Sequence, residues 1–339
     1  MRIVLDAMGG DRAPEEIIRG AVDAARSLDV EIALAGRPQI VERVLRSLSP
    51  PPSVTVLPAE QVIGMDEHPA AAVREKPNSS IAVGLRALRQ GQADAFVSAG
   101  NTGAVMAGAI LLLGRIRGVK RPALGTVFPT AGGGRVLILD VGANAEAKAE
   151  YLLQSAHMGR AYAAGALHRA NPRIGLLSIG EEASKGNMLI QEVHTALGDD
   201  PDLNFVGNLE GNTIPSGAAD VVVTDGFTGN VAIKVAEGAA EFIQNELRGA
   251  LTSRWHYKLA AAVLRPALRR VRSRIDYAEY GGAPLLGVNG VVIVAHGRSN
   301  ARAIVNAVRV ARDAVAGGVV SQIAQAMAVE RGGKEEPVN

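Results

Sequence analysis

Short apolar, β-branched runs alternate with longer amphipathic stretches along most of the chain. Each run is followed by a polar or glycine-rich turn and then by apolar residues at helical spacing. This alternation is typical of βα units, which build a mainly parallel sheet covered by helices. The predicted strands are 2–6, 30–35, 54–57, 94–98, 122–127, 135–140, 173–179, 203–207, 220–225 and 291–295. The predicted helices are about 14–28, 79–90, 102–113, 147–169, 187–197, 228–247 and 299–330.

The predicted strands 122–127 and 135–140 are separated by a linker that is too short for a crossover helix, so we expect an antiparallel hairpin on the parallel sheet. No internal repeat and no clean linker interrupt the pattern. The fold class is therefore α/β, and 1–247 with 280–331 forms one large three-layer α/β/α catalytic unit. We expect 248–279 to be an inserted basic amphipathic helical segment and 332–339 to be a frayed tail.

The composition of the 339 residues is that of a globular protein, with 47% apolar and 21% charged residues. The absence of cysteine excludes disulfides, Cys zinc sites, iron–sulfur clusters and thiol nucleophiles. Asp6 interrupts anything resembling a signal-peptide core, and the longest apolar run, 104–113, is much shorter than the roughly 18 residues of a membrane span. These features predict a cytoplasmic protein.

The net charge of +2 is distributed unevenly. Segment 248–275 has no acidic residue and eight basic residues, so −6 is left for the rest of the chain. The basic residues are Arg248, Arg254, Lys258, Arg265, Arg269, Arg270, Arg272 and Arg274.

Apolar residues in the same segment recur at helical spacing beside the basic stripe, which predicts an amphipathic cationic helix pair broken near Pro266. An anionic membrane surface, an acidic protein and a dimer partner are the competing contacts. Nucleic acid is disfavoured because only 3% of the residues are aromatic. The predicted membrane or carrier contacts are Leu251, Arg254, Trp255, Lys258, Leu259, Arg265, Arg269, Arg270 and Arg272.

Ligands bind beyond the carboxyl ends of parallel strands, so the turns after the strands are the candidate site. Seven such turns are polar and rich in glycine, and we expect them on one edge of the sheet. A single turn of this kind is routine, because Gly, Asn and Asp tolerate positive φ. The seven turns are 6–11, 98–103, 140–144, 180–187, 208–211, 225–230 and 296–300.

Turn 98–103 leads into a predicted helix, so its backbone N–H groups could hold an anion such as phosphate. The same residues also make a competent N-cap and tight turn. No phosphate-binding P-loop and no dinucleotide fingerprint occur in the chain. The candidate phosphate- or substrate-binding residues are Asp6, Gly9, Gly10, Asp11, Gly100, Asn101, Thr102, Gly103, Asn144, Asn187, Asp225 and His296.

Lys185 is one of only seven lysines and lies in a polar loop before a predicted helix. Its ammonium suits phosphate or a developing oxyanion, and the alternative is a solvated loop lysine. Asn230 is either an amide directed at a reacting oxygen or a plain residue of a helix N-terminus.

The six histidines show no metal-ligand spacing, so we expect no metal. His296 follows a buried strand and is either an acid–base group or a structural histidine. No GxSxG elbow is present to indicate a serine acyl-enzyme.

Eight motifs together resemble the PlsX-type phosphate acyltransferases of bacterial phospholipid synthesis, and they span nearly the whole chain. They are DAMGGD at 6–11, HPAAAVREKPNSS at 68–80, SAGNTGA at 98–104, DVGAN at 140–144, LLSIGEEASKGN at 176–187, GNLEG at 207–211, DGFTGN at 225–230 and YGGAPLLGVNG at 280–290. No motif of the family aligns with 248–275.

The resemblance implies transfer of a long-chain acyl group from acyl carrier protein to inorganic phosphate, with Lys185 and Asn230 at catalytic positions and no cofactor. It implies a homodimer with a fold similar to isocitrate and isopropylmalate dehydrogenases and to phosphotransacetylase. The further partners are an anionic surface at the inner face of the cell membrane and a downstream acyltransferase that uses acyl phosphate. The alternatives are a phosphotransacetylase-like enzyme acting on a coenzyme A ester, a dehydrogenase-like enzyme acting on a hydroxy acid, and a non-catalytic membrane or protein adaptor.

Overall fold

The computed structural model describes residues 1–275 and 281–332, without the side chains of 270–275 and 329–332. Residues 276–279 of the predicted insertion and 333–339 of the predicted tail lie outside the described residues.

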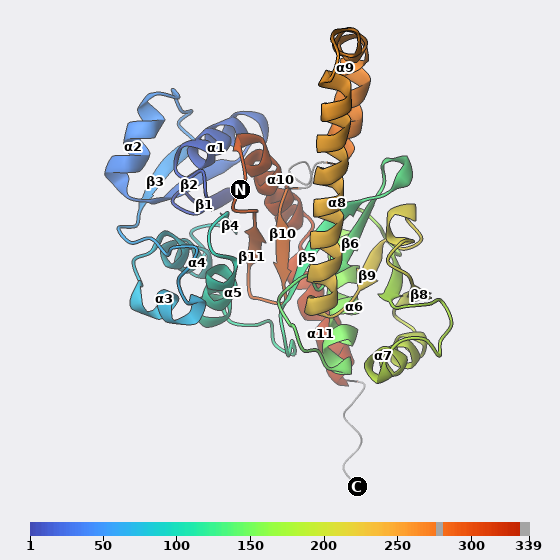
Figure 1. Ribbon diagram of the computed structural model, residues 1–339. Helices are drawn as coiled ribbons and strands as arrows, with labels where there is room; N and C mark the ends of the chain where they lie inside the picture. Colours follow the sequence, from blue (N-terminus) through green and yellow to red (C-terminus); the bar gives the residue numbers. More distant parts are fainter. Residues whose placement is uncertain (276–280, 333–339) are drawn as a thin grey trace.

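One mixed sheet runs through the described part of the molecule (Figure 1), in the order β3-β2-β1-β4-β11-β10-β5-β6-β9-β7-β8. Its mainly parallel pairing confirms the predicted fold class, and β5 and β6 form the predicted antiparallel hairpin. The prediction missed β10, a short strand between glycines. The strands are β1 (Arg2–Asp6), β2 (Glu31–Gly36), β3 (Val54–Pro58), β4 (Ala95–Ser98), β5 (Ala123–Pro129), β6 (Arg135–Leu139), β7 (Arg173–Leu177), β8 (Asn204–Leu209), β9 (Val221–Val223), β10 (Ala283–Leu286) and β11 (Val291–Val294).

The two parallel halves of the sheet run in opposite directions. Strand β10 is antiparallel to both β11 and β5, and β5 is antiparallel to β6. The turns after β1, β4 and β11 (7–14, 99–101 and 295–300) therefore leave one edge, called here the Asp6 edge. The turns after β6, β7 and β9 (140–148, 178–187 and 224–225) leave the opposite edge, the Asp140 edge. The expectation that all these turns share one edge is wrong, because an odd number of antiparallel pairings reverses the second half.

Helices cover both faces of the sheet, as the two separate apolar clusters show. One face carries α1 (Glu15–Ser27), α2 (Pro38–Arg46), α6 (Ala149–Ala166), α7 (Met188–Gly198), α10 (Ala301–Ala316) and α11 (Val319–Gly332). The other face carries α3 (Pro69–Glu75), α4 (Ser80–Arg89), α5 (Thr102–Gly108) with the π-helical turn Ala109–Leu113, and part of α8 (Gly226–Thr252). Two short 3₁₀ turns are Ala131–Gly133 and Ile214–Ser216.

Two helix predictions need correction. The predicted helix 299–330 is divided into α10 and α11 by Gly317 and Gly318, the latter with a φ of 60°. The prediction also missed α2 and α3, which are short and begin at a proline. Pro38 and Pro69 occupy the first helical position, where no N–H is needed.

Helices α8 and α9 (Trp255–Ile275) form a hairpin whose far end projects from the body of the molecule (Figure 1). The predicted break near Pro266 is wrong, because the chain reverses at Ser253 and Arg254 while Pro266 lies inside α9. Half-buried Ala261 and Leu268 flank the proline, so packing continues on both sides of it. Of the helices in the described ranges, none is long and apolar enough to cross a membrane.

Candidate active site

Asp140 organises the turn that follows β6. Its side chain is nearly fully buried and accepts hydrogen bonds from four backbone N–H groups and one side-chain amide. Oδ1 accepts from Leu124 at 3.2 Å, Gly142 at 3.0 Å and Ala143 at 2.9 Å, and Oδ2 accepts from the N–H of Asn144 at 2.8 Å and its Nδ2 at 2.9 Å. A buried carboxylate with this many donors fixes the turn against β5.

Asn144 connects this turn to the start of α8. Its Nδ2 also donates to the carbonyl of Pro122 at 2.8 Å, and its own carbonyl accepts from the N–H of Gly226 at 2.8 Å. A Cβ at Gly226 would lie 2.7 Å from that carbonyl oxygen, so the close approach requires glycine. Asp225 caps α8, with Oδ1 accepting from the N–H of Thr228 at 2.8 Å.

Asn230 lies in the second turn of α8, with an exposed side chain. Its Nδ2 donates to the carbonyl of Val141 at 3.0 Å. The helix begins at Gly226 instead of the predicted 228, so Asn230 is not a capping residue. Within the described residues, its Oδ1 makes no hydrogen bond, and this oxygen and the second Nδ2 proton are available to a ligand.

Lys185 lies in the loop between β7 and α7. Its backbone N–H donates to the carbonyl of Glu182 at 3.0 Å, and Asn187 caps α7 by accepting from the N–H of Ile190 at 3.0 Å. The Lys185 side chain is exposed, and its Nζ has no hydrogen bond or ion pair with any described residue. The loop is thus held at both ends while the ammonium remains open to an anion.

Asn208, at the end of β8, supports the loop between β7 and α7 through a hydrogen bond. It is buried, its Nδ2 donates to the carbonyl of Glu182 at 2.9 Å, and its Oδ1 lies 2.9 Å from Nδ1 of His194. The buried Ser178 hydroxyl, at the start of the loop, has no hydrogen-bond partner among the described residues.

On the opposite edge, Asp6 is fully buried beneath the turn that follows β1. Its Oδ2 accepts from the Ser98 hydroxyl at 2.7 Å and its Oδ1 from the N–H of Met8 at 3.0 Å. The Ser98 oxygen in turn accepts from the N–H of Gly100 at 3.0 Å. Burial raises the pKa of Asp6, against the opposing effect of hydrogen bonds from Ser80 and Ser98.

The glycines of the Asp6 edge allow two turns to pack directly on each other. A Cβ at Gly9 would lie 2.4 Å from Oδ2 of Asp6 and 2.8 Å from Cα of Gly100. Gly10 has a φ of 106°, which favours glycine. Gly9 and Gly10 therefore offer a ligand backbone groups, beside the exposed side chain of Asp11.

Asn101 is occupied by structural contacts. Its Oδ1 caps α5 by accepting from the N–H of Ala104 at 3.0 Å. Its Nδ2 lies 3.1 Å from the carbonyls of Gly64, Met65 and Glu67. Nearby Thr102 is exposed, and Gly103 packs against Pro69.

His296 is half-buried beside α8. Burial lowers its pKa, and so do the Lys234 ammonium and Arg298, whereas Glu237 and Asp11 act in the opposite direction. The N–H of Arg298 donates to His296 Nδ1 at 3.1 Å, and Lys234 forms an ion pair with Glu237 at 2.8 Å. The charges of Lys234 and Glu237 on α8 are therefore close enough to His296, at the Asp6 edge, to influence its pKa.

Helix α8 brings the two edges together. Asn230 and Lys234 are one helical turn apart, about 6 Å along the axis. Asn230 donates a hydrogen bond to Val141 in the turn after β6, and the charge of Lys234 lowers the pKa of His296. The predicted site residues thus form two groups. Asp6, Gly9, Gly10, Asp11, Gly100, Asn101, Thr102, Gly103 and His296 belong to the Asp6 edge, and Asn144, Lys185, Asn187, Asp225 and Asn230 belong to the Asp140 edge.

Sequence reasoning places Asp140, Ser98 and Asn208 in candidate turns but does not assign them as residues that shape the site. Their position in the sequence could have indicated this role, because each residue stands at or directly beyond the carboxyl end of a predicted strand. Each of them bonds a residue that is distant in the chain. Asp140 accepts from the N–H of Leu124, 16 residues away, Ser98 donates to the Asp6 carboxylate, 92 residues away, and Asn208 donates to the carbonyl of Glu182, 26 residues away.

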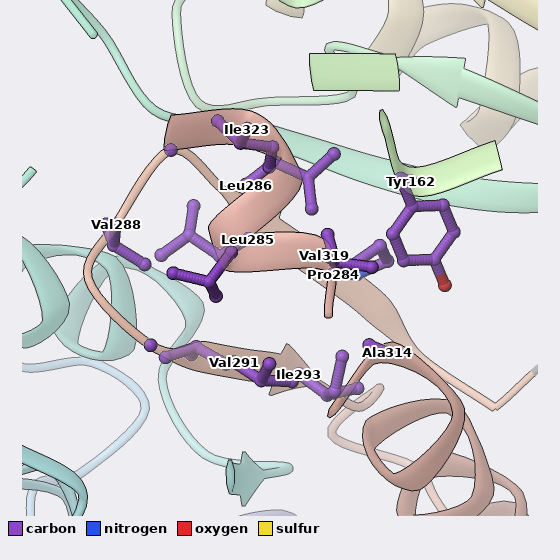
Figure 2. A pocket seen from close by; sticks show the side chains of 14 residues that line it. Tyr162, Pro284, Leu285, Leu286, Val288, Val291, Ile293, Ala314, Val319 and Ile323 are labelled. Atoms are coloured by element: carbon purple, nitrogen blue, oxygen red, sulfur yellow. The ribbon is translucent and has the colours of Figure 1, made fainter. Parts of the chain in front are cut away.

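An apolar cavity lies between β10, β11 and the helices α6, α10 and α11 (Figure 2). Figure 2 shows Leu285, Val319 and Ile323 around it, with the ring of Tyr162 at one side. Its volume is about 10 Å³, close to that of one water, so it does not hold an acyl chain in this conformation. The described residues contain no group of three or more His, Asp or Glu side chains that could hold a metal ion.

The predicted contacts of the basic segment lie on the α8–α9 hairpin. Arg254, Trp255, Lys258, Leu259, Arg265 and Arg269 are exposed, and Leu251 is half-buried. The side chains of Arg270 and Arg272 lie outside the described residues.

Similar solved structures share the fold of this chain. A phosphotransacetylase from Streptococcus pyogenes superposes with a TM-score of 0.59 at 19% identity, covering 97% of this chain and 94% of that one. The 4-hydroxythreonine-4-phosphate dehydrogenase of Klebsiella pneumoniae gives 0.53 at 13% identity, covering 93% and 98%. At these identities the likeness shows the fold alone, a three-layer α/β fold shared by acyl-transferring and dehydrogenase enzymes.

The sequence comparisons define the family. The family described as "Fatty acid synthesis protein" matches residues 1–322. The "Phosphate acyltransferase" of Desulfitobacterium hafniense (strain DSM 10664 / DCB-2) is 50% identical over 324 residues, covering 95% of this chain and 96% of its own. The chain belongs to this family of PlsX-type phosphate acyltransferases, which confirms the resemblance carried by the motifs.

Proposed function

We propose that the chain transfers a long-chain fatty acyl group from acyl carrier protein to inorganic phosphate, producing acyl phosphate for phospholipid synthesis. The observation that carries this proposal is the open ammonium of Lys185 on a fixed loop of the Asp140 edge, in a chain of the phosphate acyltransferase family. The available proton on Asn230 and the glycine turns supply further donors to a polyanion.

In the proposed reaction a phosphate oxygen attacks the thioester carbonyl carbon, forming a C–O bond and a tetrahedral oxyanion. The oxyanion collapses, the C–S bond breaks, and the sulfur leaves with the electron pair and takes a proton to give the free carrier thiol. Lys185 and Asn230 bind phosphate and stabilise the oxyanion, and the fixed turns orient the reactants. Thioester and acyl phosphate are both activated, so the step needs neither ATP nor a cofactor.

Direct attack by phosphate can be separated from a covalent enzyme intermediate. Labelled free carrier is incubated with acylated carrier and enzyme, without phosphate. Direct attack predicts no exchange of label into the acylated carrier, whereas phosphate-independent exchange would show an acyl-enzyme and contradict this mechanism.

The donor is tested by measuring phosphate-dependent loss of thioester for the same acyl chain on acyl carrier protein and on coenzyme A. The proposal predicts a higher kcat/KM with the carrier protein. A preference for the coenzyme A ester supports the phosphotransacetylase-like alternative, and loss of neither thioester supports an adaptor.

We propose that the protein is a homodimer joined through α8. Phe227, Val231 and Val235 are spaced by four residues on this helix and are 65%, 46% and 65% exposed. Such a continuous apolar stripe is typical of an interface. Sedimentation is expected to show a dimer for the wild type and monomers for Val235→Glu, and a monomeric wild type would reject the proposal.

We further propose a cytoplasmic protein that associates peripherally and reversibly with the inner face of the cell membrane, close to the acyltransferase that consumes acyl phosphate. Trp255, Leu259 and Val263 on α9 are 74%, 60% and 80% exposed among basic residues. Each cation near an anionic surface contributes about 1 kcal/mol and is screened by salt. The association is therefore expected to be salt-sensitive.

The membrane proposal is tested with Arg265→Glu/Arg269→Glu, compared with Arg43→Glu/Arg46→Glu on distant α2. The α9 variant is expected to leave anionic vesicles while the control stays bound. An α9 variant that remains on the vesicles would contradict the membrane assignment.

A further inference from the structure

Segment 115–121, between the π-helical turn and β5, forms a second cationic surface. Its four basic side chains, Arg115, Arg117, Lys120 and Arg121, are all exposed. The sequence has no acidic residue between Asp94 and Asp140. In Figure 1 the chain between α5 and β5 passes on the side of the molecule away from the projecting α8–α9 hairpin.

Buried contacts hold the backbone of this segment in place. Ile116 and Val119 are almost completely buried, and the N–H of Ile116 donates to the carbonyl of Gly287 at 3.0 Å. The buried amide of Gln154 accepts from the N–H of Lys120 at 2.8 Å and donates to the carbonyl of Gly118 at 3.1 Å. The cations are therefore presented from a fixed backbone, which lowers the ordering cost of binding.

Among the described residues, an acidic side chain pairs with only one of the four cations. Lys120 lies 3.6 Å from Glu150, an exposed pair of small energetic value. The Arg121 guanidinium lies 6.0 Å from the centre of the Tyr151 ring, which keeps its charge. Arg117 has no hydrogen bond or ion pair with a described residue. The surface remains strongly positive.

The segment adjoins the Asp140 edge directly. Arg121 precedes Pro122, whose carbonyl accepts from Asn144 Nδ2 at 2.8 Å, and the Asn144 carbonyl binds the N–H of Gly226 at the start of α8. By contrast, the α8 residue Thr252 is about 33 Å from Asn230 along the helix axis. The second cationic surface is thus beside the candidate catalytic residues, and the end of the hairpin is not.

We infer that segment 115–121 docks the acidic face of the acyl carrier protein that delivers the thioester, an inference that rests on the proposed function. Four exposed cations on a fixed backbone suit an acidic partner surface, because opposite charges at an interface steer association and set its orientation. The partly exposed Ile110 and Leu111 add an apolar contact next to the charges.

The test is binding of fluorescently labelled apo carrier protein at low ionic strength to the full chain. Arg117→Glu/Arg121→Glu is expected to weaken binding about tenfold or more and to flatten its salt dependence. The control Arg43→Glu/Arg46→Glu makes the same charge change on α2 and is expected to bind within about twofold of the wild type. Arg117→Glu alone is the fallback if the double variant does not fold, because Arg117 is exposed and makes no hydrogen bond or ion pair with a described residue.

Turnover supplies a second readout. With acylated carrier, kcat/KM of the double variant is expected to fall about tenfold, whereas with a neutral small thioester of the same chain it stays within about twofold. Equal losses with both donors, equal losses in the α2 control, unchanged carrier binding or no carrier binding by the wild type would each overturn the inference. Release of the double variant from anionic vesicles with unchanged carrier binding would assign the surface to lipid and also overturn it.

Failure of the proposed function would appear differently. A wild-type protein that binds carrier through 115–121 but consumes no thioester in the presence of phosphate would retain the docking surface and reject the acyl transfer.

Discussion

The Asp6 edge and the Asp140 edge are built in the same way but differ in what they offer a ligand. Each places a buried aspartate at the carboxyl end of a strand, and each aspartate fixes a glycine-rich turn. Asp140 accepts five hydrogen bonds from N–H donors, four of them from the backbone. Asp6 is bonded mainly through hydroxyl groups and the N–H of Met8, and its burial raises its pKa.

The difference between the edges lies in what remains open to a ligand. At the Asp6 edge, Asp6 and Asn101 are occupied by contacts within the protein, which leaves backbone groups and the exposed side chains of Asp11 and Thr102. At the Asp140 edge, the ammonium of Lys185 and one Nδ2 proton of Asn230 are available to a ligand, and hydrogen bonds hold the segments that carry them. We therefore expect substitutions at the Asp140 edge to reduce catalysis and substitutions at the Asp6 edge to reduce stability first.

The largest effect is expected for Asn230→Asp. A carboxylate would face the carbonyl of Val141, now 3.0 Å from Nδ2, and would repel phosphate. Turnover should fall by more than about 10³-fold, against about 10²–10³-fold for Asn230→Ala. Steady-state kinetics with both variants checks this order, and an Asp variant as active as the wild type would remove Asn230 from the mechanism.

Lys185→Ala is expected to lower kcat by about 10²–10³-fold, the typical loss of one oxyanion-stabilising donor. The melting temperature should not change, because the side chain is exposed and its Nζ has no hydrogen bond or ion pair with a described residue. Arg46→Ala, another exposed cation, serves as the control and should keep full activity. Near-normal turnover of Lys185→Ala would place the chemistry elsewhere.

Gly9→Ala tests the support at the other edge. The added methyl would lie 2.4 Å from Asp6 Oδ2 and 2.8 Å from Gly100 Cα, so the turns must separate. The free energy of unfolding should fall by about 1–3 kcal/mol, as for other overpacked sites. Gly198→Ala is the control, since no heavy atom lies within 4 Å of its added methyl. Equal denaturation midpoints for the two variants would contradict the close packing.

The smallest effect is a pH dependence at Asp6. Its pKa is raised in the folded state, so the stability that protonated Asp6 contributes is complete below the unfolded pKa of about 3.9 and is lost as the pH rises through the folded value. Between the unfolded and the folded pKa, the free energy of unfolding of the wild type should therefore fall relative to that of Asp6→Asn. Above the folded pKa, the difference between the two proteins should stay constant. Denaturant titrations at several pH values measure this difference, and a constant difference would contradict a raised pKa.

Many strands and helices of the fold, and two candidate site residues, could be predicted from local sequence patterns. Runs such as 2–6 and 135–139 alternate with amphipathic helices and are strands in the structure, and the short 129–134 connection predicts the hairpin correctly. Turn composition makes Lys185 and Asn230 candidates, and the family motifs predict them as catalytic residues. Both signals are local, because a turn's conformation depends on its own residues.

The division into two edges could not be read in this way. It depends on β10, four residues that pair with β5 about 160 residues earlier in the chain, through Leu285 and Leu124. The roles of Asp140 and Asn208 likewise depend on distant partners, Leu124 in β5 and Glu182 in the loop after β7. Such contacts arise from tertiary packing and leave no periodic pattern in the sequence.

The most direct test of the account is transfer of radiolabelled inorganic phosphate into an organic-extractable acyl phosphate, measured in one turnover with acylated carrier protein. The account predicts labelled product and free carrier thiol in equal amounts for the wild type and for the α2 control. Lys185→Ala should form both about 10²–10³-fold more slowly. Thiol released at the wild-type rate without phosphate, or labelled product formed equally fast by Lys185→Ala, would contradict phosphate transfer at the Asp140 edge.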